Sequence, residues 1–502
     1  MDKKYILTID QGTTGSRVIL FNHEGQAAFS AYREIRQIYP NPGWVEHDPD
    51  EYVSSVLACA EEVFLRSGII PAQIEAIGIT NQRETTILWD RESGKPLYNA
   101  IVWQCRRTAD YCDMLKSQGY EKEIREKTGL FIDPYFSATK IKWIIDNVDG
   151  VKQKIEAGKV CMGTVDSWLI FNLSGGKYHV TDYSNASRTM LLNIHSLDWD
   201  EDILEILTID RQILPELKPT SGIMAHTDKG GAFGKVFNCK IPVSGVAGDQ
   251  QSALFGQGCF KPGMAKNTYG TALGLMMNIG SKPVMSNNGL LTDLLGVINK
   301  EVYYSLEGLV YIGGAAIQWL RDGIKIIKDA HECDILSEKV KDTGGVYVVP
   351  AYTGLGAPYW DSYARGIIIG ITRGTSREHI CRATLESIAY QSKDMINAMI
   401  ADSGKALNSL RVDGGATKSD FLMQFQADIL GIPVERPKVT EMAALGAAYL
   451  AGLGVGFWES FSDLEKQWQL DKRYEPQMDL QKRQDLYSSW KRAVERSFNW
   501  AR

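Results

Sequence analysis

Two stretches far apart in the chain share one plan: an apolar run typical of a β-strand, small residues, and then an Asp-Gln pair. The first is Ile9-Asp10-Gln11-Gly12, and the second is Val243-Ser-Gly-Val-Ala-Gly-Asp249-Gln250-Gln251. Two more strand-like runs, Met264–Thr268 and Leu273–Asn278, follow the second copy. The repeat predicts duplicated domains that face each other across a cleft, although the Asp-Gln pair by itself leaves a chance repeat open.

The length and charge of the chain limit the classes of protein to which it can belong. Its 502 residues exceed what one hydrophobic core organises, so we expect two domains of roughly 250 residues each. Apolar residues make up 44% and charged residues 23%, which is ordinary for a soluble globular protein. A formal net charge of −6 argues against a role at nucleic acid or at a membrane surface.

The first residues and the cysteines bear on the cellular compartment. Met1-Asp-Lys-Lys leads directly into the first strand, so we expect no signal peptide. A run of about 18 apolar residues, as a membrane span requires, does not occur in the sequence. The eight cysteines show no C-x-x-C pairing. This pattern favours reduced thiols in a cytoplasmic protein and disfavours a structural zinc site.

Strand and helix patterns alternate along the chain, which indicates an α/β fold. Asp48 as N-cap, Pro49 at the first helical position and Glu51 in the first turn predict a helix that ends near Ser67-Gly68. Buried strands are expected at Ile74–Thr80 and Thr85–Trp89. The small-sided run Ala443–Gly452 predicts a helix that packs closely against a neighbour.

The stretch from Asp10 to Arg17 predicts a β-hairpin that binds an anion. It joins the strand-like runs Tyr5–Ile9 and Val18–Phe21. Gly12 allows a tight turn, and the N–H groups, the hydroxyls of Thr13, Thr14 and Ser16, and the Arg17 charge can then converge on phosphate. The Asp10 carboxylate suits a hydrated metal ion. A Walker motif is absent from the sequence, and an ordinary tight turn is the alternative.

Three polar or aromatic groups are candidates for binding a hydroxylated ligand. Arg83-Glu84 follows a predicted strand and can grip neighbouring hydroxyls, although a surface ion pair is the commoner fate of such a dipeptide. Trp103 offers an aromatic wall or a core side chain. Tyr135 precedes the predicted helix Ser137–Asn147 and can donate to a hydroxyl or pack in a turn.

The second half holds two Gly-rich turns that lead from strands into helices. Gly313-Gly314 precedes the run Ile317–Leu320, and Gly414-Gly415 precedes a helix around Phe421–Leu430. Small residues at these turns let the backbone lie flat against a ligand, and helix N-termini nearby favour anionic groups.

Longer stretches resemble one known family. Tyr135-Phe-Ser-Ala-Thr-Lys140-Ile-Lys-Trp143-Ile-Ile-Asp-Asn147 resembles the first signature of the FGGY carbohydrate kinases. The second signature is resembled by Gly366-Ile-Ile-Ile-Gly370-Ile371, followed by His379-Ile-Cys-Arg-Ala-Thr-Leu-Glu386. The match spans residues 5 to about 460. Stretches that resemble those of the members that phosphorylate glycerol are Pro42-Gly-Trp-Val-Glu-His-Asp-Pro49, Asn81-Gln-Arg-Glu-Thr-Thr86, Trp103-Gln-Cys-Arg-Arg107 and Gly248-Asp-Gln-Gln251.

The resemblance implies an α/β protein of two ribonuclease-H-like (actin-like ATPase) domains, 1–253 and 254–502, that face each other across a catalytic cleft. It implies ATP and Mg²⁺ as cofactors, glycerol as the substrate, and a homodimer or homotetramer. One alternative is an FGGY kinase of another small polyol or ketose. The other, from a different class, is an actin-like ATPase without a polyol substrate.

The resemblance also assigns roles to residues. Asp249 is expected to be the general base, and Asp10 to orient Mg²⁺ through water. The expected substrate contacts are Arg83, Glu84, Trp103, Tyr135, Asp249 and Gln250. The expected nucleotide contacts are Thr13, Thr14, Gly15, Arg17, Thr271, Gly314, Gln318, Gly415 and Ser419.

Three positions depart from the family pattern. Gly15 stands where the family has Ser, and Ser419 stands where it has Asn near the adenine. Gly274 replaces the aromatic residue that packs on the carbons of glycerol. We expect glycerol to remain the preferred substrate with a raised KM, unless Leu273 or Tyr311 fills the gap.

Overall fold

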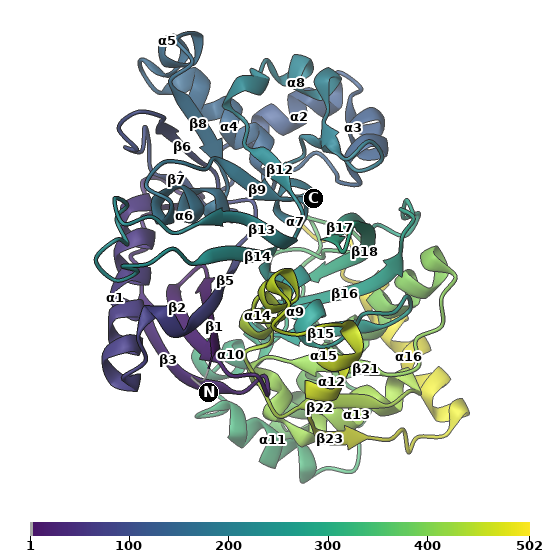
Figure 1. Cartoon of the computed structure of the whole chain (residues 1–502). Helices are drawn as coiled ribbons and strands as arrows, with labels where there is room; N and C mark the ends of the chain where they lie inside the picture. The colour runs from purple at the N-terminus through teal and green to yellow at the C-terminus, as the bar shows by residue number, and fades with distance from the viewer. Residues whose placement is uncertain (1–3, 502) are drawn as a thin grey trace.

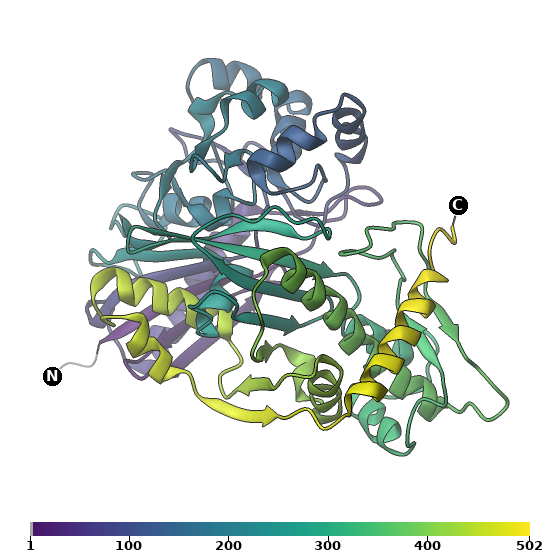
Figure 2. The same cartoon turned by 90° about the vertical axis from the view of Figure 1, so that its right-hand side faces the viewer.

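The computed structural model describes residues 4–501. Two large mixed β-sheets, one from each half of the chain, form its centre, and helices pack against their faces (Figure 1, Figure 2). Residues 1–3, where we expect no signal peptide, lie outside the described residues. No helix within the described range is long and apolar enough to span a membrane.

The first sheet runs in the order β13-β14-β5-β1-β2-β3. Neighbours are antiparallel from β1 to β3, whereas β5 and β14 run parallel to β1. The predicted hairpin is present, and the Gly12 N–H closes its turn on the Gly15 carbonyl at 2.9 Å. The strands are β1 (Tyr5–Gln11), β2 (Gly15–Phe21), β3 (Ala27–Glu34), β5 (Ile74–Asn81), β13 (Ser221–His226) and β14 (Pro242–Gly248).

The second sheet runs in the order β17-β18-β16-β15-β21-β22-β23. Here β15 pairs antiparallel with β16 and parallel with β21, which repeats the relation of β1 to β2 and β5. The strands are β15 (Ala265–Tyr269), β16 (Leu273–Gly280), β17 (Leu291–Ile298), β18 (Glu301–Val310), β21 (Leu410–Asp413), β22 (Val434–Pro437) and β23 (Leu470–Tyr474). The expected pair of α/β domains is therefore present.

One detail of the predicted repeat is different. Asp249 follows β14, which belongs to the first sheet and lies parallel to β5. The counterpart of the β1–β2 hairpin is instead β15–β16, joined by the turn at Tyr269-Gly270-Thr271. The two Asp-Gln pairs have a common place in the fold. Because β1 and β14 both run parallel to β5, they end at the same edge of the first sheet, and each brings a carboxylate to that edge.

The remaining strands form short two-stranded pairs. They are β4 (Glu46–His47) with β7 (Ala100–Ile101), β6 (Ile87–Asp90) with β8 (Val160–Gly163), β9 (Val180–Asp182) with β12 (Glu216–Lys218), β10 (Leu192–Asn193) with β11 (Asp198–Trp199), and β19 (Tyr347–Val349) with β20 (Ile367–Ile369). Several of them lie with α2–α5 and α8 at the top of the molecule (Figure 1).

Two helices have the ends that the sequence predicts. Helix α1 begins at Pro49, with Asp48 accepting a hydrogen bond from the Asp50 N–H at 3.0 Å, and ends before a left-handed Gly68. Helix α4 spans Ser137–Asn147 as expected. The helices are α1 (Pro49–Ser67), α2 (Ala109–Ser117), α3 (Glu121–Thr128), α4 (Ser137–Asn147), α5 (Val151–Glu156), α6 (Val165–Leu173), α7 (Tyr183–Ala186), α8 (Glu201–Leu207), α9 (Asp249–Gly256), α10 (Ala315–Asp322), α11 (Ala330–Glu338), α12 (Arg377–Ser403), α13 (Asp420–Leu430), α14 (Met442–Val455), α15 (Phe461–Gln467) and α16 (Leu480–Glu495), with short 3₁₀ turns at Pro71–Gln73, Arg211–Ile213 and Gly415–Lys418.

Helix α14 comes from the second half of the chain but packs on the first sheet and on α9. Its small residues allow backbone to lie against backbone. A Cβ added at Gly446 would stand 1.8 Å from the Ser252 carbonyl of α9, and one added at Gly78 of β5 would stand 2.4 Å from the Ala447 carbonyl. The predicted close packing of this helix is confirmed.

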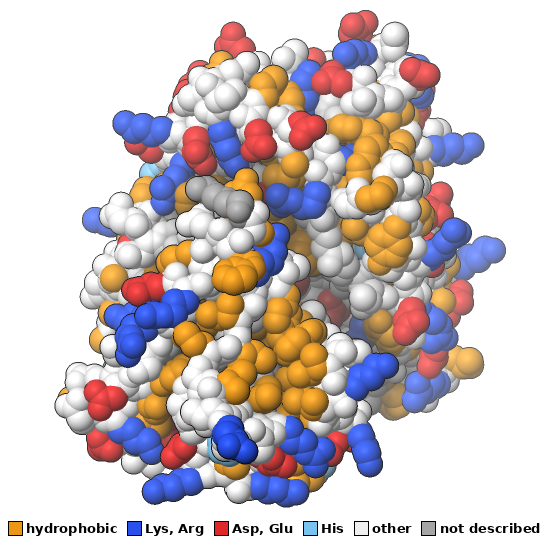
Figure 3. Space-filling model, turned by 180° about the vertical axis from the view of Figure 1, so that it is seen from behind, with side chains coloured by type: hydrophobic (Ala, Val, Ile, Leu, Met, Phe, Trp, Pro, Cys, Tyr) orange, Lys and Arg blue, Asp and Glu red, His pale blue; other side chains and the backbone are white. Residues whose placement is uncertain are grey.

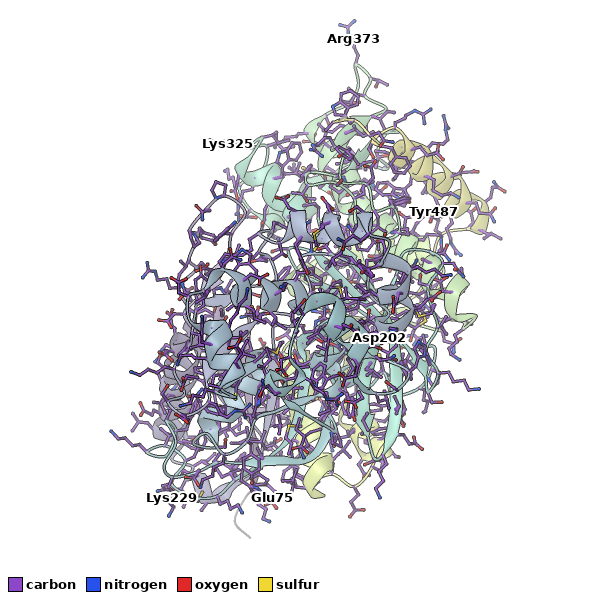
Figure 4. The ribbon with its side chains drawn as sticks, turned by 90° about the horizontal axis from the view of Figure 1, so that it is seen from above. Glu75, Asp202, Lys229, Lys325, Arg373 and Tyr487 are labelled. Carbon is purple, nitrogen blue, oxygen red and sulfur yellow. The ribbon has the colours of Figure 1, made fainter. Side chains whose placement is uncertain are left out.

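Much of each half lies toward a different end of the molecule, although α14 of the second half packs on the first sheet. Seen from above, Glu75 and Lys229 of the first half mark one end, and Arg373 and Tyr487 of the second half mark the other (Figure 4). From behind, the surface is hollowed between the upper and lower parts, and an acidic side chain shows inside the hollow (Figure 3).

Candidate functional site

Aromatic side chains pack against the β1–β2 hairpin. The Thr13 hydroxyl accepts a hydrogen bond from the Trp103 indole at 2.9 Å. A Cβ added at Gly15 would stand 2.4 Å from the Tyr32 phenol oxygen, and the Arg17 guanidinium lies 5.4 Å from the centre of the Tyr32 ring. Tyr32 therefore fills the space that a Ser side chain would need at position 15. This explains the first departure from the family pattern.

Two acidic groups, from the starts of α14 and α9, approach Asp10 and Arg17 of the hairpin. Arg17 forms an ion pair with Glu441, which lies directly before α14. Burial raises the pKa of Asp10 to about 7; Arg17 opposes this rise, while Glu441 and Asp249 reinforce it. Asp10 thus lies within electrostatic reach of two further carboxylates. A cation at this point would relieve their mutual repulsion.

Arg83 and Glu84 do not form a surface ion pair, because both are buried, at 4% and 1% exposure. The Arg83 Nε lies 3.2 Å from the Asp249 Oδ1 and 3.9 Å from the Glu84 Oε1. Glu84 has a φ of 61°, a left-handed conformation that is costly for a residue with a side chain. Strain of this kind persists where the surroundings enforce it. The left-handed backbone at Glu84 directs its buried carboxylate toward Arg83.

Asp249 is the more accessible member of this group, with 38% of its side chain exposed. It opens α9, and its Oδ1 accepts from the Gln250 N–H at 2.7 Å and faces Arg83. Both of these contacts use Oδ1. Oδ2 is therefore available to a ligand in the cleft.

Trp103 and Tyr135 form a wall beside these charges. Their ring centroids are 5.6 Å apart in an edge-to-face arrangement, and both side chains are half-buried. Lys140 of α4 is buried and donates to the Tyr135 carbonyl at 2.5 Å. Burial lowers the Lys140 pKa to about 8. Neither Trp103 nor Tyr135 is a plain core residue, because each also contacts a charged or polar group of the site.

Apart from its two neighbours in the chain, the side chain closest to Gly274 is that of Gln250 and not that of Tyr311. A Cβ at Gly274 would stand 2.4 Å from the Gln250 Oε1. The same oxygen accepts a hydrogen bond from the buried Lys266 of β15, which also donates to the Thr268 hydroxyl at 2.9 Å. The amide oxygen is occupied in this way. The Gln250 Nε2 is then the atom that remains to donate to a ligand.

The expected nucleotide contacts of the second half lie in turns and helix starts next to the second sheet. The turn at Gly313-Gly314 is joined to the β15–β16 turn, since the Gly314 N–H donates to the Gly270 carbonyl at 2.9 Å and Gly313 to Thr271 at 2.8 Å. Thr271, Gln318 and Gly415 are exposed, and a Cβ at Gly415 would meet no atom within 4 Å. Ser419 caps α13 and donates to Asp334 of α11 at 2.5 Å. A polar surface is therefore open on this side of the cleft.

Comparison with known proteins identifies the family. A model described as the FGGY family of carbohydrate kinases, N-terminal domain, matches residues 5–256, and the model of the C-terminal domain matches residues 265–455. The chain belongs to the FGGY family of carbohydrate kinases. It is similar to the glycerol kinase of Caldanaerobacter subterraneus subsp. tengcongensis, at 60% identity over 498 residues and 99% of each chain. Glycerol kinase 2 of Thermotoga maritima is 60% identical over 497 residues, again 99% of each.

Solved structures agree with this family. Plasmodium falciparum glycerol kinase with ADP matches with a TM-score of 0.93 and 39% identity, covering 99% of this chain and 98% of that chain. The xylulose kinase of Lactobacillus acidophilus matches with a TM-score of 0.88 at 24% identity, covering 99% of each chain. The second likeness concerns the fold alone.

Several charged residues of the FGGY site escaped the sequence argument. They are Arg188, Lys266, Asp293, Glu307, Asp334 and Glu441, and each contacts a predicted site residue or its direct partner. None of them lies in a recognisable local motif. The signal that was available is a charged residue inside an otherwise apolar strand pattern, as Glu307 shows in β18 and Asp293 in β17.

Proposed function

We propose that this FGGY kinase transfers the γ-phosphoryl group of ATP to a primary hydroxyl of glycerol, giving sn-glycerol 3-phosphate in the first step of glycerol catabolism. The observation that carries the proposal is 60% identity to glycerol kinases over 99% of both chains. The geometry agrees with it, because Arg83, Glu84 and Asp249 converge beside an aromatic wall.

Asp249 acts as the general base in this proposal. Its Oδ2 takes the proton of the attacking hydroxyl as the new bond to phosphorus forms. Arg83 and Glu84 bind the neighbouring hydroxyls as donor and acceptor, Gln250 donates through its amide, and Trp103 and Tyr135 cover the carbon chain. Proton removal comes late in a loose transition state, so positioning and charge neutralisation supply most of the rate enhancement.

The phosphates of ATP lie between the two sheets. Thr13, Thr14, Gly15 and Arg17 hold them from the hairpin, and Thr271, Gly314, Gln318, Gly415 and Ser419 hold the nucleotide from the other side. Within residues 4–501 no group of three metal-ligating side chains occurs, which fits Mg²⁺, because this ion keeps several waters and binds through one or two carboxylates and the substrate phosphates. Asp10 would hold it through water. Bound Mg²⁺ neutralises phosphate charge.

A coupled assay tests the proposal. The chain is mixed with Mg-ATP, and ADP is measured with and without glycerol. A kinase makes ADP only when polyol is present, apart from slow leakage, whereas an actin-like ATPase makes the same ADP in both cases. A panel of glycerol, dihydroxyacetone, glyceraldehyde, erythritol and xylulose then decides between glycerol and another polyol or ketose.

Assembly and compartment belong to the same proposal. We infer a homodimer or homotetramer, which light scattering after size-exclusion chromatography tests directly. We also infer a cytoplasmic location. The described cysteines support it, because all are free thiols and most are buried.

A further inference from the structure

The Glu307 carboxylate of β18 forms a bidentate contact with the Arg83 guanidinium. The Arg83 Nη2 donates to the Glu307 Oε1 at 2.5 Å, and Nη1 donates to the Glu307 Oε2 at 2.9 Å. Glu307 is 2% exposed. A carboxylate that accepts from both terminal nitrogens of a guanidinium fixes its plane as well as its position. Glu307 therefore sets the direction in which Arg83 faces the cleft.

Counting donors shows what this leaves for a ligand. Arginine has five N–H groups. In Arg83 three of them are used by Glu307 and Gln251, and the Nε group faces Asp249. One N–H of Nη2 remains. The bidentate contact thus leaves a single free donor, on the guanidinium edge whose Nε group faces the Asp249 carboxylate.

Glu307 also connects Arg83 to Glu84. Its Oε2 lies 2.8 Å from the Arg188 Nη1, and the Arg188 Nε donates to the Glu84 Oε1 at 2.6 Å. Arg188 is buried and pairs with Asp293 at 2.7 Å as well. Although burial opposes it, Arg188 and Arg83 hold the pKa of Glu307 below its ordinary value, so this carboxylate stays ionised. One ionised group therefore orients both the donor and the acceptor of the polyol site.

The two partners come from opposite halves of the molecule. Arg83 follows β5 of the first sheet, while Glu307 lies in β18 of the second, 224 residues further along the chain. The strand β18 ends at Val310 and leads directly into the turn at Gly313-Gly314. The arginine that faces the polyol is therefore fixed by the strand that carries the nucleotide turn.

We infer that Glu307 is a positioning residue of the polyol site, which fixes Arg83 and, through Arg188, Glu84 from the opposite half of the molecule. This inference rests on the proposed function. Loss of the carboxylate leaves Arg83 free to turn toward Asp249 and removes one of the three carboxylates that Arg188 contacts. Polyol affinity therefore falls, while the ATP contacts beside the second sheet persist. Disturbed orienting partners typically cost a factor of 10 to 100.

The test compares Glu307→Gln with Glu435→Gln. Glutamine at 307 keeps the volume of the side chain but replaces one carboxylate oxygen with an NH₂ group. This group cannot accept a hydrogen bond from Arg83 or Arg188, because it is itself a donor. Glu435 of β22 is the matched control, because it is also a buried carboxylate of the second sheet, paired with Arg411 at 3.6 Å and with Arg473. Steady-state KM is measured for ATP and for the polyol that the wild type phosphorylates fastest. We expect E307Q to raise the polyol KM about 10- to 100-fold with the ATP KM within about threefold, and E435Q to change neither.

A conservative variant keeps the test decisive if E307Q does not fold. Glu307→Asp retains the charge but withdraws it by one methylene, so its polyol KM should lie between those of the wild type and E307Q. If E307Q does not fold, the polyol KM of Glu307→Asp should rise above that of the wild type while its ATP KM stays unchanged. An unchanged polyol KM in the folded variants, or equal rises for polyol and ATP, overturns the inference while the proposed function stands. A wild-type chain that phosphorylates no polyol overturns both.

Discussion

Asp249 is a single carboxylate on which the proposed chemistry depends. Its Oδ1 is taken by the Gln250 N–H and Arg83, and its Oδ2 is free for the substrate. Asparagine has nearly the same size and can still accept through one oxygen, but it cannot accept a proton from a hydroxyl.

Replacing Asp249 with Asn should therefore lower kcat by about 10²–10⁴, the usual contribution of a general base. The dissociation constant for glycerol should change far less, because the other hydroxyl contacts remain. Steady-state kinetics and calorimetric titration with glycerol measure the two quantities. A variant that keeps more than half of the wild-type kcat removes Asp249 from this role.

Gly274 shows how one missing side chain changes its neighbours. A ring at this position would cover roughly 40 Å² of the C–H surface of glycerol, worth about 1 kcal/mol and about a fivefold change in binding. The sequence argument therefore expects a ring to tighten glycerol binding. The structure opposes this, because the Gln250 Oε1 already stands 2.4 Å from where the Cβ would be, and Lys266 holds that oxygen.

From the structure we expect Gly274→Phe to raise the KM for glycerol by about tenfold, since displacing Gln250 leaves a buried ammonium short of a partner at a cost of about 1–3 kcal/mol. Gly274→Ala should act in the same direction but less. Both variants are assayed with glycerol and with erythritol. A lowered glycerol KM together with lost erythritol turnover would show that Gln250 moves aside and that the ring packs on the polyol.

At the scale of the element, the β1–β2 hairpin combines a tight turn with a half-buried acid. Asp10 is the last residue but one of β1, and burial together with nearby acids raises its pKa. Such a group binds a cation favourably.

Replacing Asp10 with Ala should make turnover depend on much higher Mg²⁺, because the carboxylate that orients the water shell of the ion is lost. The measurement is a Mg²⁺ titration at fixed ATP, with Thr14→Ala as a hairpin control that keeps the acid. If the Mg²⁺ dependence of Asp10→Ala matches that of the wild type, the hairpin contacts phosphate but does not orient the metal.

Helix α16 is fastened to α12 through another buried acid. Asp394 accepts from the Tyr487 phenol at 2.6 Å and from the Trp490 indole at 2.8 Å. Burial raises the pKa of Asp394 to about 6, and the hydrogen bonds oppose the rise. The folded state thus binds this proton more tightly than the unfolded chain does.

The wild type should therefore lose stability from this group as the pH rises from about 4 to above 6, by about 3 kcal/mol at most. Asp394→Asn does not titrate. The free energy of unfolding of the variant minus that of the wild type should therefore increase by up to this amount over the same pH range. Urea titrations at pH 4.5 and 7.5 test this, and a difference that does not vary with pH would contradict it.

At the scale of the whole molecule, α14 ties the two halves together. It follows β22 of the second sheet in the chain, yet it packs on β5, β14 and α9 of the first half, and Glu441 at its start pairs with Arg17. The division of the chain into domains 1–253 and 254–502 stays a prediction. Helix α14 belongs to the second of these ranges but packs on elements of the first.

Gly446→Ala should destabilise the protein by about 3 kcal/mol, the upper end for overpacking, because the new Cβ would stand 1.8 Å from a backbone carbonyl that cannot swing away. Gly374→Ala is the control, since its Cβ would meet only the Thr372 hydroxyl at 3.8 Å. Thermal and urea unfolding measure both variants. Equal stabilities would mean that α14 is loosely packed.

The sequence by itself determined the local features of this protein. Capping residues set the ends of α1, alternation and turn glycines set the β1–β2 and β15–β16 hairpins, and the family motifs led to Arg83 and Asp249. The predictions of helix ends and hairpins are correct because caps, turns and periodicity act within a few neighbouring residues, so that the sequence shows both partners at once.

Only the tertiary structure decided which distant groups meet. It placed Asp249 directly after β14 of the first sheet instead of in a second hairpin, joined Glu307 to Arg83, and turned Gln250 toward Lys266 beside Gly274. Each of these contacts joins residues that the sheet order and the packing of α14 bring together. A buried charge must find a partner, but the sequence alone does not say which of the many charges it will be.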